Sequence, residues 1–317
     1  MLQNFYPNAS QLIYGCMGLG GDWDHSPITR EHYLQARTAV ETALEEGITV
    51  FDHADIYTMG KAETVFGQVL KDTPSLRNDM IIQSKCAIRF EDELGPKRYE
   101  ISADWIRQSV EQSLTRLGLD HLEILLLHRP DPLMELAEVA ECLTQLIQEG
   151  KIAHVGVSNM HWHQIQYLQS ALDKPIVANQ LEMSLAFRDW MEDGITTGST
   201  ANRNSGFAPG TLEYCMTHNV QLQAWGSLAQ GRFTGGTTSG TTDEATRQAV
   251  AELAALYQVT PEAIVLGWLT RHPANIQPII GSTKPERIRA CTGVSELRLS
   301  REHWYHLLET VWGREVP

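Results

Sequence analysis

Eight short apolar segments, separated by longer amphipathic stretches, run along the whole chain. They are residues 13–17, 48–51, 80–84, 122–127, 152–157, 176–180, 220–225 and 276–280. Each is rich in Val, Ile or Leu and too short for a typical helix, which is typical of strands buried on both faces. Eight such strands alternating with helices predict a closed (β/α)₈ TIM barrel, of class α/β, rather than an open doubly wound sheet.

The stretches between these segments carry helix boundary signals. Helices are predicted at residues 30–46, 103–117, 135–149, 160–172, 209–218 and 243–257, and an additional helix beyond the barrel at 300–312. Gly47, Gly118 and Gly150 stand where helices commonly end. No linker divides the chain, so residues 1–317 are expected to form one domain. Two polar, glycine-rich segments, 187–208 and 234–242, are expected to be long loops over the catalytic face.

Composition excludes several classes of partner. The net charge of −14 argues against general binding to nucleic acid or to anionic membranes, which requires basic patches. The five cysteines are scattered and form no CxxC pair, and no metal site is predicted. The first residues lack a signal-peptide pattern, and no run approaches 18 apolar residues, so a cytoplasmic location is expected. A monomer is favoured because no extended apolar surface pattern is evident.

Four residues with reactive side chains fall at or just after the ends of successive predicted strands. These are Asp52, Tyr57, Lys85 and His128. Because the active site of such a barrel lies at the carboxyl ends of its strands, the four are expected to converge. An ammonium beside a tyrosine lowers the pKa of the phenol, and a carboxylate holds the ammonium in place. Such a tyrosine can give a proton to a carbonyl oxygen, which His128 could orient.

Each of these residues also has a simple structural interpretation. Asp52 and Lys85 could form an ion pair that only closes the barrel, Tyr57 could pack at the rim, and His128 could anchor a loop. Four together at strand ends favour catalysis. None of them can supply a hydride, so carbonyl reduction would require a nicotinamide or similar cofactor.

The segment FDHADIYTMGKAETVFGQVL, residues 51–70, resembles a segment of the aldo-keto reductase superfamily that carries Asp and Tyr five residues apart. IIQSKC supplies the matching Lys85, LLLHRPDP the matching His128, and GVSN the pair Ser158 and Asn159. HADIY and LLLHRPDP together resemble a bacterial branch of general oxidoreductases. The resemblance covers nearly the whole chain and implies a (β/α)₈ barrel that reduces aldehydes or ketones to alcohols with NADPH. Tyr57 would be the general acid.

The resemblance also implies a cofactor site without a Rossmann fold. Ser158, Asn159 and Gln180 would hold the carboxamide, and Trp225 would lie against the nicotinamide or else belong to the core. The pyrophosphate loop would contain Ser227, Leu228, Gln230 and Gly231, and the adenosine end would contain Gly281, Ser282, Thr283, Lys284 and Arg287. A local basic cluster at the start of a helix favours the 2′-phosphate of NADP, and a solvated helix face is the alternative. Ala290 and Cys291 depart from the family pattern at the adenine ring.

Substrate choice is expected to depend on the rim loops. Trp23 and Trp190 could line an aromatic substrate pocket, or each could pack against its own loop. Two other functions stay open: a cofactor-binding barrel that senses redox state or binds a partner with little catalysis, and, further off, a barrel isomerase.

Overall fold

The computed structural model describes residues 1–199, 207–237 and 240–317 and contains a closed barrel of parallel strands. Around the barrel the strands follow the order β1-β10-β9-β8-β7-β6-β3-β2. Their bounds are β1 Ile13–Gly15, β2 Val50–Asp52, β3 Ile81–Cys86, β6 Leu122–Leu127, β7 Ile152–Ser158, β8 Ile176–Glu182, β9 Gln221–Trp225 and β10 Gln277–Ile280. The predicted barrel is therefore confirmed, and each of the eight apolar segments contributes a strand.

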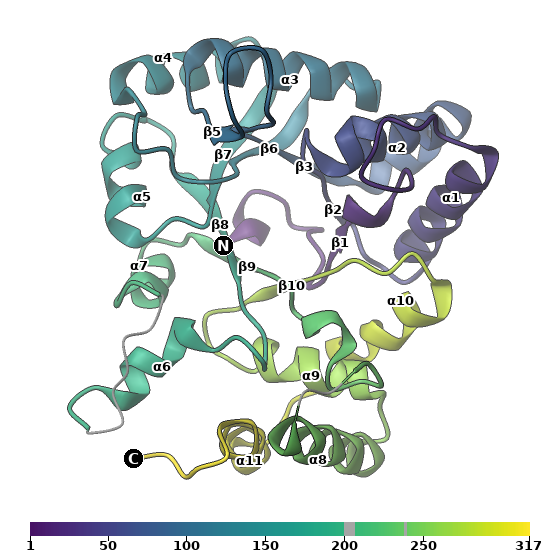
Figure 1. The fold of residues 1–317 in the computed structure, drawn as a ribbon, viewed down its shortest axis with the longest axis vertical. Helices are drawn as coiled ribbons and strands as arrows, with labels where there is room; N and C mark the ends of the chain where they lie inside the picture. Colours follow the sequence, from purple (N-terminus) through teal and green to yellow (C-terminus); the bar gives the residue numbers. More distant parts are fainter. Residues whose placement is uncertain (200–206, 238–239) are drawn as a thin grey trace.

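Helices surround this ring of strands (Figure 1). Their bounds are α1 Arg30–Glu45, α2 Lys61–Asp72, α3 Ala103–Leu117, α4 Leu136–Gln148, α5 Trp162–Gln169, α6 Asp189–Thr196, α7 Thr211–Thr217, α8 Thr241–Tyr257, α9 Pro261–Thr270, α10 Pro285–Thr292 and α11 Arg301–Trp312. A small antiparallel pair, β4 Ile88–Arg89 and β5 Arg98–Tyr99, follows β3 and was not expected. The predicted additional helix is α11, which lies beside α8.

Two of the expected boundaries differ from the structure. The segment 187–208, expected to be a loop, contains α6, because Trp190 and Met191 give this polar stretch an apolar face that is buried. In the segment 234–242, α8 begins at Thr241. The remaining parts of these two predicted loops, residues 200–206 and 238–239, lie outside the described residues.

The first residues of the chain close the amino-terminal end of the barrel. Leu2 is fully buried, and its backbone N–H donates to Gln221 Oε1 at 3.3 Å at the start of β9. Tyr6 Oη donates to the carbonyl of Glu123 at the start of β6. Figure 1 shows the N-terminus at the centre of the ring of strands. A ligand can therefore approach the barrel interior from the carboxyl ends of the strands.

Within the described residues no single helix is both long and apolar enough to cross a membrane. The helices α8 and α9 pass such a test only as a pair, and they are bent by 94° relative to each other.

Candidate active site

Lys85 lies at the centre of the residues that the sequence predicts to be catalytic. It is 1% exposed, and its ammonium donates three hydrogen bonds: to Asp52 Oδ2 at 2.7 Å, to Tyr57 Oη at 2.8 Å and to the His53 carbonyl at 2.8 Å. An ammonium has three donors, so all of them are used. Since Tyr57 Oη accepts from Lys85, its own proton is free to point toward a ligand.

Asp52 is held by two glutamine amides inside the barrel. Gln83 Nε2 donates to Asp52 Oδ1 at 2.5 Å, and Gln180 Nε2 donates to the same oxygen at 3.0 Å. Gln83 and Gln223 exchange reciprocal hydrogen bonds of 2.9 Å. This role of Gln83 and Gln223 was not predicted from the sequence. The feature that could have indicated it is a polar residue inside an otherwise apolar strand segment.

The turn after β2 brings Tyr57 over this centre. Thr58 and Met59 follow it with φ of 47° and 60°, in the left-handed region that β-branched and bulky residues rarely adopt. Thr58 Oγ1 donates to the carbonyl of Leu19 at 2.9 Å, which ties the turn to the first loop. The strained backbone therefore fixes the phenol relative to Lys85.

The direction of the pKa shift of Tyr57 differs from the one expected from the sequence. Burial raises the pKa of Tyr57 to about 12, because it outweighs the lowering by Lys85, and Asp52 raises the pKa further. Burial alone would lower the pKa of Lys85, but Asp52 and Tyr57 together raise it. The expected lowering of the tyrosine pKa is therefore wrong. Tyr57 keeps its proton throughout the neutral range, as a proton donor must.

His128 completes the predicted group at the end of β6. Its ring lies nearly perpendicular to that of Tyr57, with 6.2 Å between centroids. Burial, Lys85 and Arg129 hold the pKa of His128 well below its usual range, so the imidazole is neutral. Its Nδ1 is buried and has no partner among the described residues. We call Asp52, Tyr57, Lys85 and His128 the catalytic cluster.

The two candidate substrate-binding tryptophans lie in different places. Trp23 is 46% exposed, and its ring centroid is 6.4 Å from that of Tyr57. Trp190 is 3% exposed and packs on the rings of Trp268 and His272. The structure thus brings Trp23 to the catalytic cluster but places Trp190 between α6 and α9. Trp190 belongs to the packing of α6, and its expected role in a substrate pocket is corrected.

The residues expected to hold the nicotinamide form a connected set at the ends of β7, β8 and β9. Asn159 Nδ2 donates to Ser158 Oγ at 2.8 Å and to the His128 carbonyl at 3.2 Å. Trp225 Nε1 donates to Asn159 Oδ1 at 3.1 Å. Gln180 directs its amide nitrogen inward, to Asp52 and Gln223. The set therefore adjoins the catalytic cluster through His128 and Asp52.

The loop after β9 has a run of left-handed residues. Leu228 has a negative φ and is followed by Ala229, Gln230 and Gly231 with φ of 47°, 56° and 80°. The N–H groups of Ala229 and Gly231 donate to the carbonyls of Gly226 and Leu228, so the loop is closed by its own hydrogen bonds. Ser227 Oγ donates to the carbonyl of Ile279 at 2.7 Å and joins this loop to β10.

The start of α10 has features that suit the 2′-phosphate of NADP, which the sequence predicts to bind there. Lys284 is the N-cap residue, and no side chain caps the helix. Lys284 and Arg287 are exposed and have no ion pair among the described residues, whereas Arg289 on the same helix pairs with Glu45 and Glu46. An uncapped helix start with two unpaired cations is a favourable place for an anion.

The other residues of this adenosine end lie against the first loop. A Cβ on Gly281 would lie 3.7 Å from the carbonyl of Gly15, and one on Gly18 would lie 3.4 Å from Thr283. Ser282 accepts from Tyr14 Oη through its carbonyl and from the Lys284 N–H through its hydroxyl. The predicted cofactor residues thus share one rim, from β7 to the start of α10.

A second buried charge network lies behind the catalytic cluster. Glu63, which is fully buried, accepts from Ser84 Oγ at 2.6 Å and from Arg116 Nε at 2.7 Å. Burial, together with the neighbouring Glu63, raises the pKa of Asp55 to about 7. The Asp55 N–H donates to the carbonyl of Lys85 at 3.0 Å, so this network braces the strand that carries the catalytic lysine.

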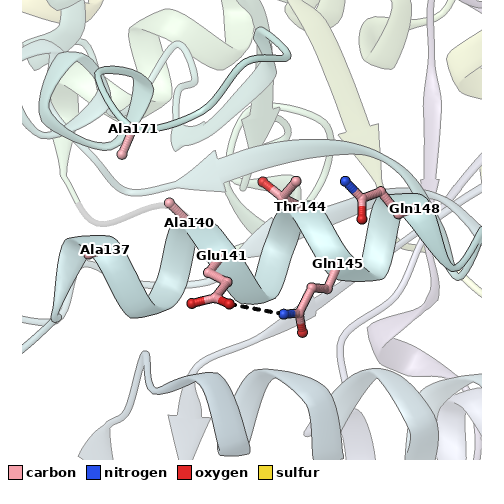
Figure 2. Close-up of a pocket in the computed structure, with 7 residues that line it drawn as sticks. All are labelled: Ala137, Ala140, Glu141, Thr144, Gln145, Gln148 and Ala171. Atoms are coloured by element: carbon pink, nitrogen blue, oxygen red, sulfur yellow. Dashed lines mark hydrogen bonds between the residues drawn. The ribbon is translucent and has the colours of Figure 1, made fainter.

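The structure has two cavities of interest. One, of about 520 Å³, lies on the outer side of α4 and is shown in Figure 2. Its lining has one charged residue, Glu141, which accepts from Gln145 at 3.2 Å and is remote from the catalytic cluster. The other, of about 410 Å³, lies over the ends of β7, β8 and β9, and its wall contains Arg129, the residue after His128. This second cavity therefore lies on the same rim as the catalytic cluster.

Possible metal ligands and cysteine thiols are the other groups of the described residues that could take part in chemistry. The described residues contain no group of three or more His, Cys, Asp or Glu side chains placed to hold a metal ion. All five cysteines are buried and free, and burial raises the pKa of Cys86 well above its usual range. Cys86 is thus a buried thiol, the default expected for a core cysteine.

Together the fold and the catalytic cluster define a barrel enzyme equipped for acid–base chemistry on a small molecule. A family model described as the aldo/keto reductase family matches residues 11–310, and the chain belongs to this family of oxidoreductases.

Its relatives include bacterial proteins of nearly the same length. It is 35% identical over 311 residues to the 6-dehydroglucose reductase of Agrobacterium fabrum (strain C58), covering 97% of this chain and 96% of that protein. It is 36% identical over 319 residues to the oxidoreductase YdhF of Escherichia coli (strain K12), with coverage of 98% and 96%. Among solved structures, an aldo/keto reductase from Klebsiella pneumoniae in complex with NADP and acetate superimposes with a TM-score of 0.72. That pair shares 22% identity, over 98% of this chain and 93% of the other.

Proposed function

We propose that this protein reduces an aldehyde or ketone to an alcohol with NADPH, and that Tyr57 is the general acid. The observation that carries the proposal is the set of three hydrogen bonds from the Lys85 ammonium. They leave the Tyr57 proton as the one available for transfer to a substrate oxygen.

The remaining members of the catalytic cluster position this proton. Asp52 neutralises the buried Lys85, and Lys85 stabilises the phenolate that forms as Tyr57 gives up its proton. Neutral His128 can donate one ring N–H to the same substrate oxygen, which fixes the carbonyl between the two side chains. The substrate oxygen thereby becomes a hydroxyl while the carbonyl carbon is reduced.

NADPH, when bound, supplies the hydride that no side chain can provide. We propose that Ser158, Asn159, Gln180 and Trp225 hold its nicotinamide end. For the pyrophosphate and adenosine ends we propose Ser227, Leu228, Gln230, Gly231, Gly281, Ser282, Thr283, Lys284 and Arg287. The unpaired cations at the start of α10 support NADPH rather than NADH. The NADP complex of the Klebsiella protein, which shares the fold, is consistent with this choice.

The substrate is expected to be a small carbonyl compound that passes beside Trp23, whose ring lies against Tyr57. The names of the bacterial relatives, one a 6-dehydroglucose reductase, support reduction as the direction of the reaction. A cytoplasmic monomer that binds no nucleic acid stays a prediction from the sequence.

The test is NADPH oxidation by the purified protein with a panel of small aldehydes and ketones, with the alcohol product quantified. The proposal expects one alcohol for each NADPH consumed. Tight NADPH binding without turnover of any carbonyl compound would contradict it and favour a cofactor-binding barrel.

A further inference from the structure

The cavity of about 410 Å³ over β7, β8 and β9, which we call the side cavity, is linked to the catalytic cluster through two residues of its wall. Arg129 in its wall follows His128 in the chain. Asn159, also in the wall, donates to the His128 carbonyl at 3.2 Å. A substrate whose carbonyl lies at Tyr57 and His128 can therefore extend into the side cavity.

Arg129 and Glu182 are the charged groups of this wall that lack a partner. Neither has a hydrogen bond or an ion pair within the described part of the chain, although each influences the other electrostatically. Burial raises the pKa of Glu182, and Arg129 partly offsets that rise. By contrast, the partly buried Arg188 is paired directly with Glu192 at 3.0 Å. Charges left without hydrogen bonds in a partly desolvated cavity are unfavourable, so a ligand that satisfies both is favoured.

The other polar side chains in the wall already have partners. Thr211 Oγ1 donates to the Ala208 carbonyl, and His161 Nδ1 accepts from the Gln164 N–H. The Asn159 amide donates to His128 and Ser158 and accepts from Trp225. The rest of the wall includes the rings of Phe187, Phe207 and Trp225. A ligand in the side cavity thus meets one cation, one carboxyl group and aromatic surface.

We propose that Arg129 and Glu182 bind hydroxyl groups of the substrate, so that the enzyme selects a polyhydroxylated aldehyde over an apolar or an anionic one. A hydroxyl group can accept from a guanidinium and donate to a carboxylate, so a chain with several hydroxyls satisfies both side chains. An apolar chain leaves both without partners. An anionic chain pairs with Arg129 but is repelled by Glu182. The C–H edges of a hydroxylated chain pack on the aromatic rings. This inference rests on the proposed carbonyl reduction.

The test uses three aldehydes of equal carbon number: erythrose with hydroxyl groups, butanal with none, and succinic semialdehyde with a carboxylate. We expect the wild type to have its highest kcat/KM for erythrose. Arg129→Met and Glu182→Gln should each lower that value about 10-fold to 100-fold, since each leaves a charged partner group or a substrate hydroxyl unsatisfied. For butanal, which offers no hydroxyl group, the fall in kcat/KM should be smaller than for erythrose in both variants, so that the ratio of the two values falls. Glu182→Gln should in addition improve turnover of succinic semialdehyde.

Arg107→Met, which breaks a surface pair with Glu149 on the outside of the barrel, is the matched control and should change no ratio. The dissociation constant of NADPH is measured for each variant by fluorescence, because the side cavity shares Asn159 and Trp225 with the proposed nicotinamide site. Equal kcat/KM for erythrose and butanal in the wild type would overturn the inference while leaving carbonyl reduction intact. A preference for succinic semialdehyde that depends on Arg129 alone would overturn it in favour of an anionic substrate. Failure with all three aldehydes despite NADPH binding would contradict the proposed function itself.

Discussion

Two parts of the barrel rim differ in whether their charged side chains have partners within the protein. At the ends of β2 and β3, Asp52 and Lys85 are buried and paired with each other and with amides, a carbonyl and a phenol. On the rim over β7 to β9 and at α10, Arg129, Glu182 and Lys284 have no such partners among the described residues. The charges of the first part have partners within the protein, whereas we propose that a ligand provides the partners in the second. Substitutions in the first should cost stability as well as turnover, and substitutions in the second should change ligand preference.

The largest effect is expected for Lys85→Met. Removing the ammonium leaves Asp52 as a buried, unpaired charge, which should destabilise the fold by about 3–5 kcal/mol. Loss of the group that tunes Tyr57 should lower turnover by about 10²-fold to 10⁴-fold. Urea unfolding and steady-state kinetics measure the two effects. In the double variant Asp52→Asn/Lys85→Met we expect stability to recover without activity. Recovery of neither would show that more than charge pairing is lost.

Gln83→Leu should lower the free energy of unfolding by about 1–3 kcal/mol, because Asp52 and Gln223 each lose a buried hydrogen-bond partner. The comparison is with Gln248→Leu, which removes an exposed contact to Glu252 on α8 and should cost less than about 0.5 kcal/mol. Equal effects of the two variants in urea unfolding would show that the glutamine network does not stabilise the cluster.

Lys284→Gln combined with Arg287→Gln should weaken NADPH binding about fivefold to tenfold, since two exposed cations each contribute less than about 1 kcal/mol. NADH binding should be unchanged, and so should the stability of the protein. Arg289→Gln is the control, because Arg289 already pairs with Glu45 and Glu46. An equal loss of affinity for NADH and NADPH would show that these cations do not recognise the 2′-phosphate.

Asp55→Asn should have the smallest effect on turnover and on ligand binding, and it should be visible as a change in the pH dependence of stability. The pKa of Asp55 is raised to about 7 in the folded protein, against about 3.9 for an unfolded aspartate. Between these values the folded state binds the proton more tightly, so Asp55 makes stability fall as pH rises from about 4 to about 7. The Asn variant should therefore gain stability relative to the wild type between pH 5 and pH 8. A constant difference between the two proteins would contradict the raised pKa.

The barrel could be predicted because its strands are buried on both faces and read as continuous apolar runs. The helices α6 and α9 were not predicted, for reasons that differ between them. Seven of the ten residues of α9 are buried, so its sequence has no polar face to mark it as a helix. In α6, Trp190 packs on Trp268 of α9, which comes from a distant part of the chain.

The site could be predicted in part for the same reason. Asp52 and Lys85 lie at the carboxyl ends of β2 and β3, and His128 follows β6 directly, so the topology alone brings them together. The pKa of Tyr57 could not be predicted, because it depends on how much burial outweighs Lys85. The side cavity depends on Arg129 and Glu182 facing the same space without touching, which no spacing in the sequence expresses.

The most direct test of the account is the rate of a single turnover in Tyr57→Phe, with NADPH bound before a small aldehyde is added. The phenylalanine ring keeps the shape of the site and removes only the proton donor and the partner of Lys85. We expect the rate to fall by about 10²-fold to 10⁴-fold at pH 7 while the dissociation constant of NADPH stays within about twofold. A single-turnover rate within tenfold of the wild type, with NADPH bound equally well, would contradict the assignment of Tyr57 as the general acid.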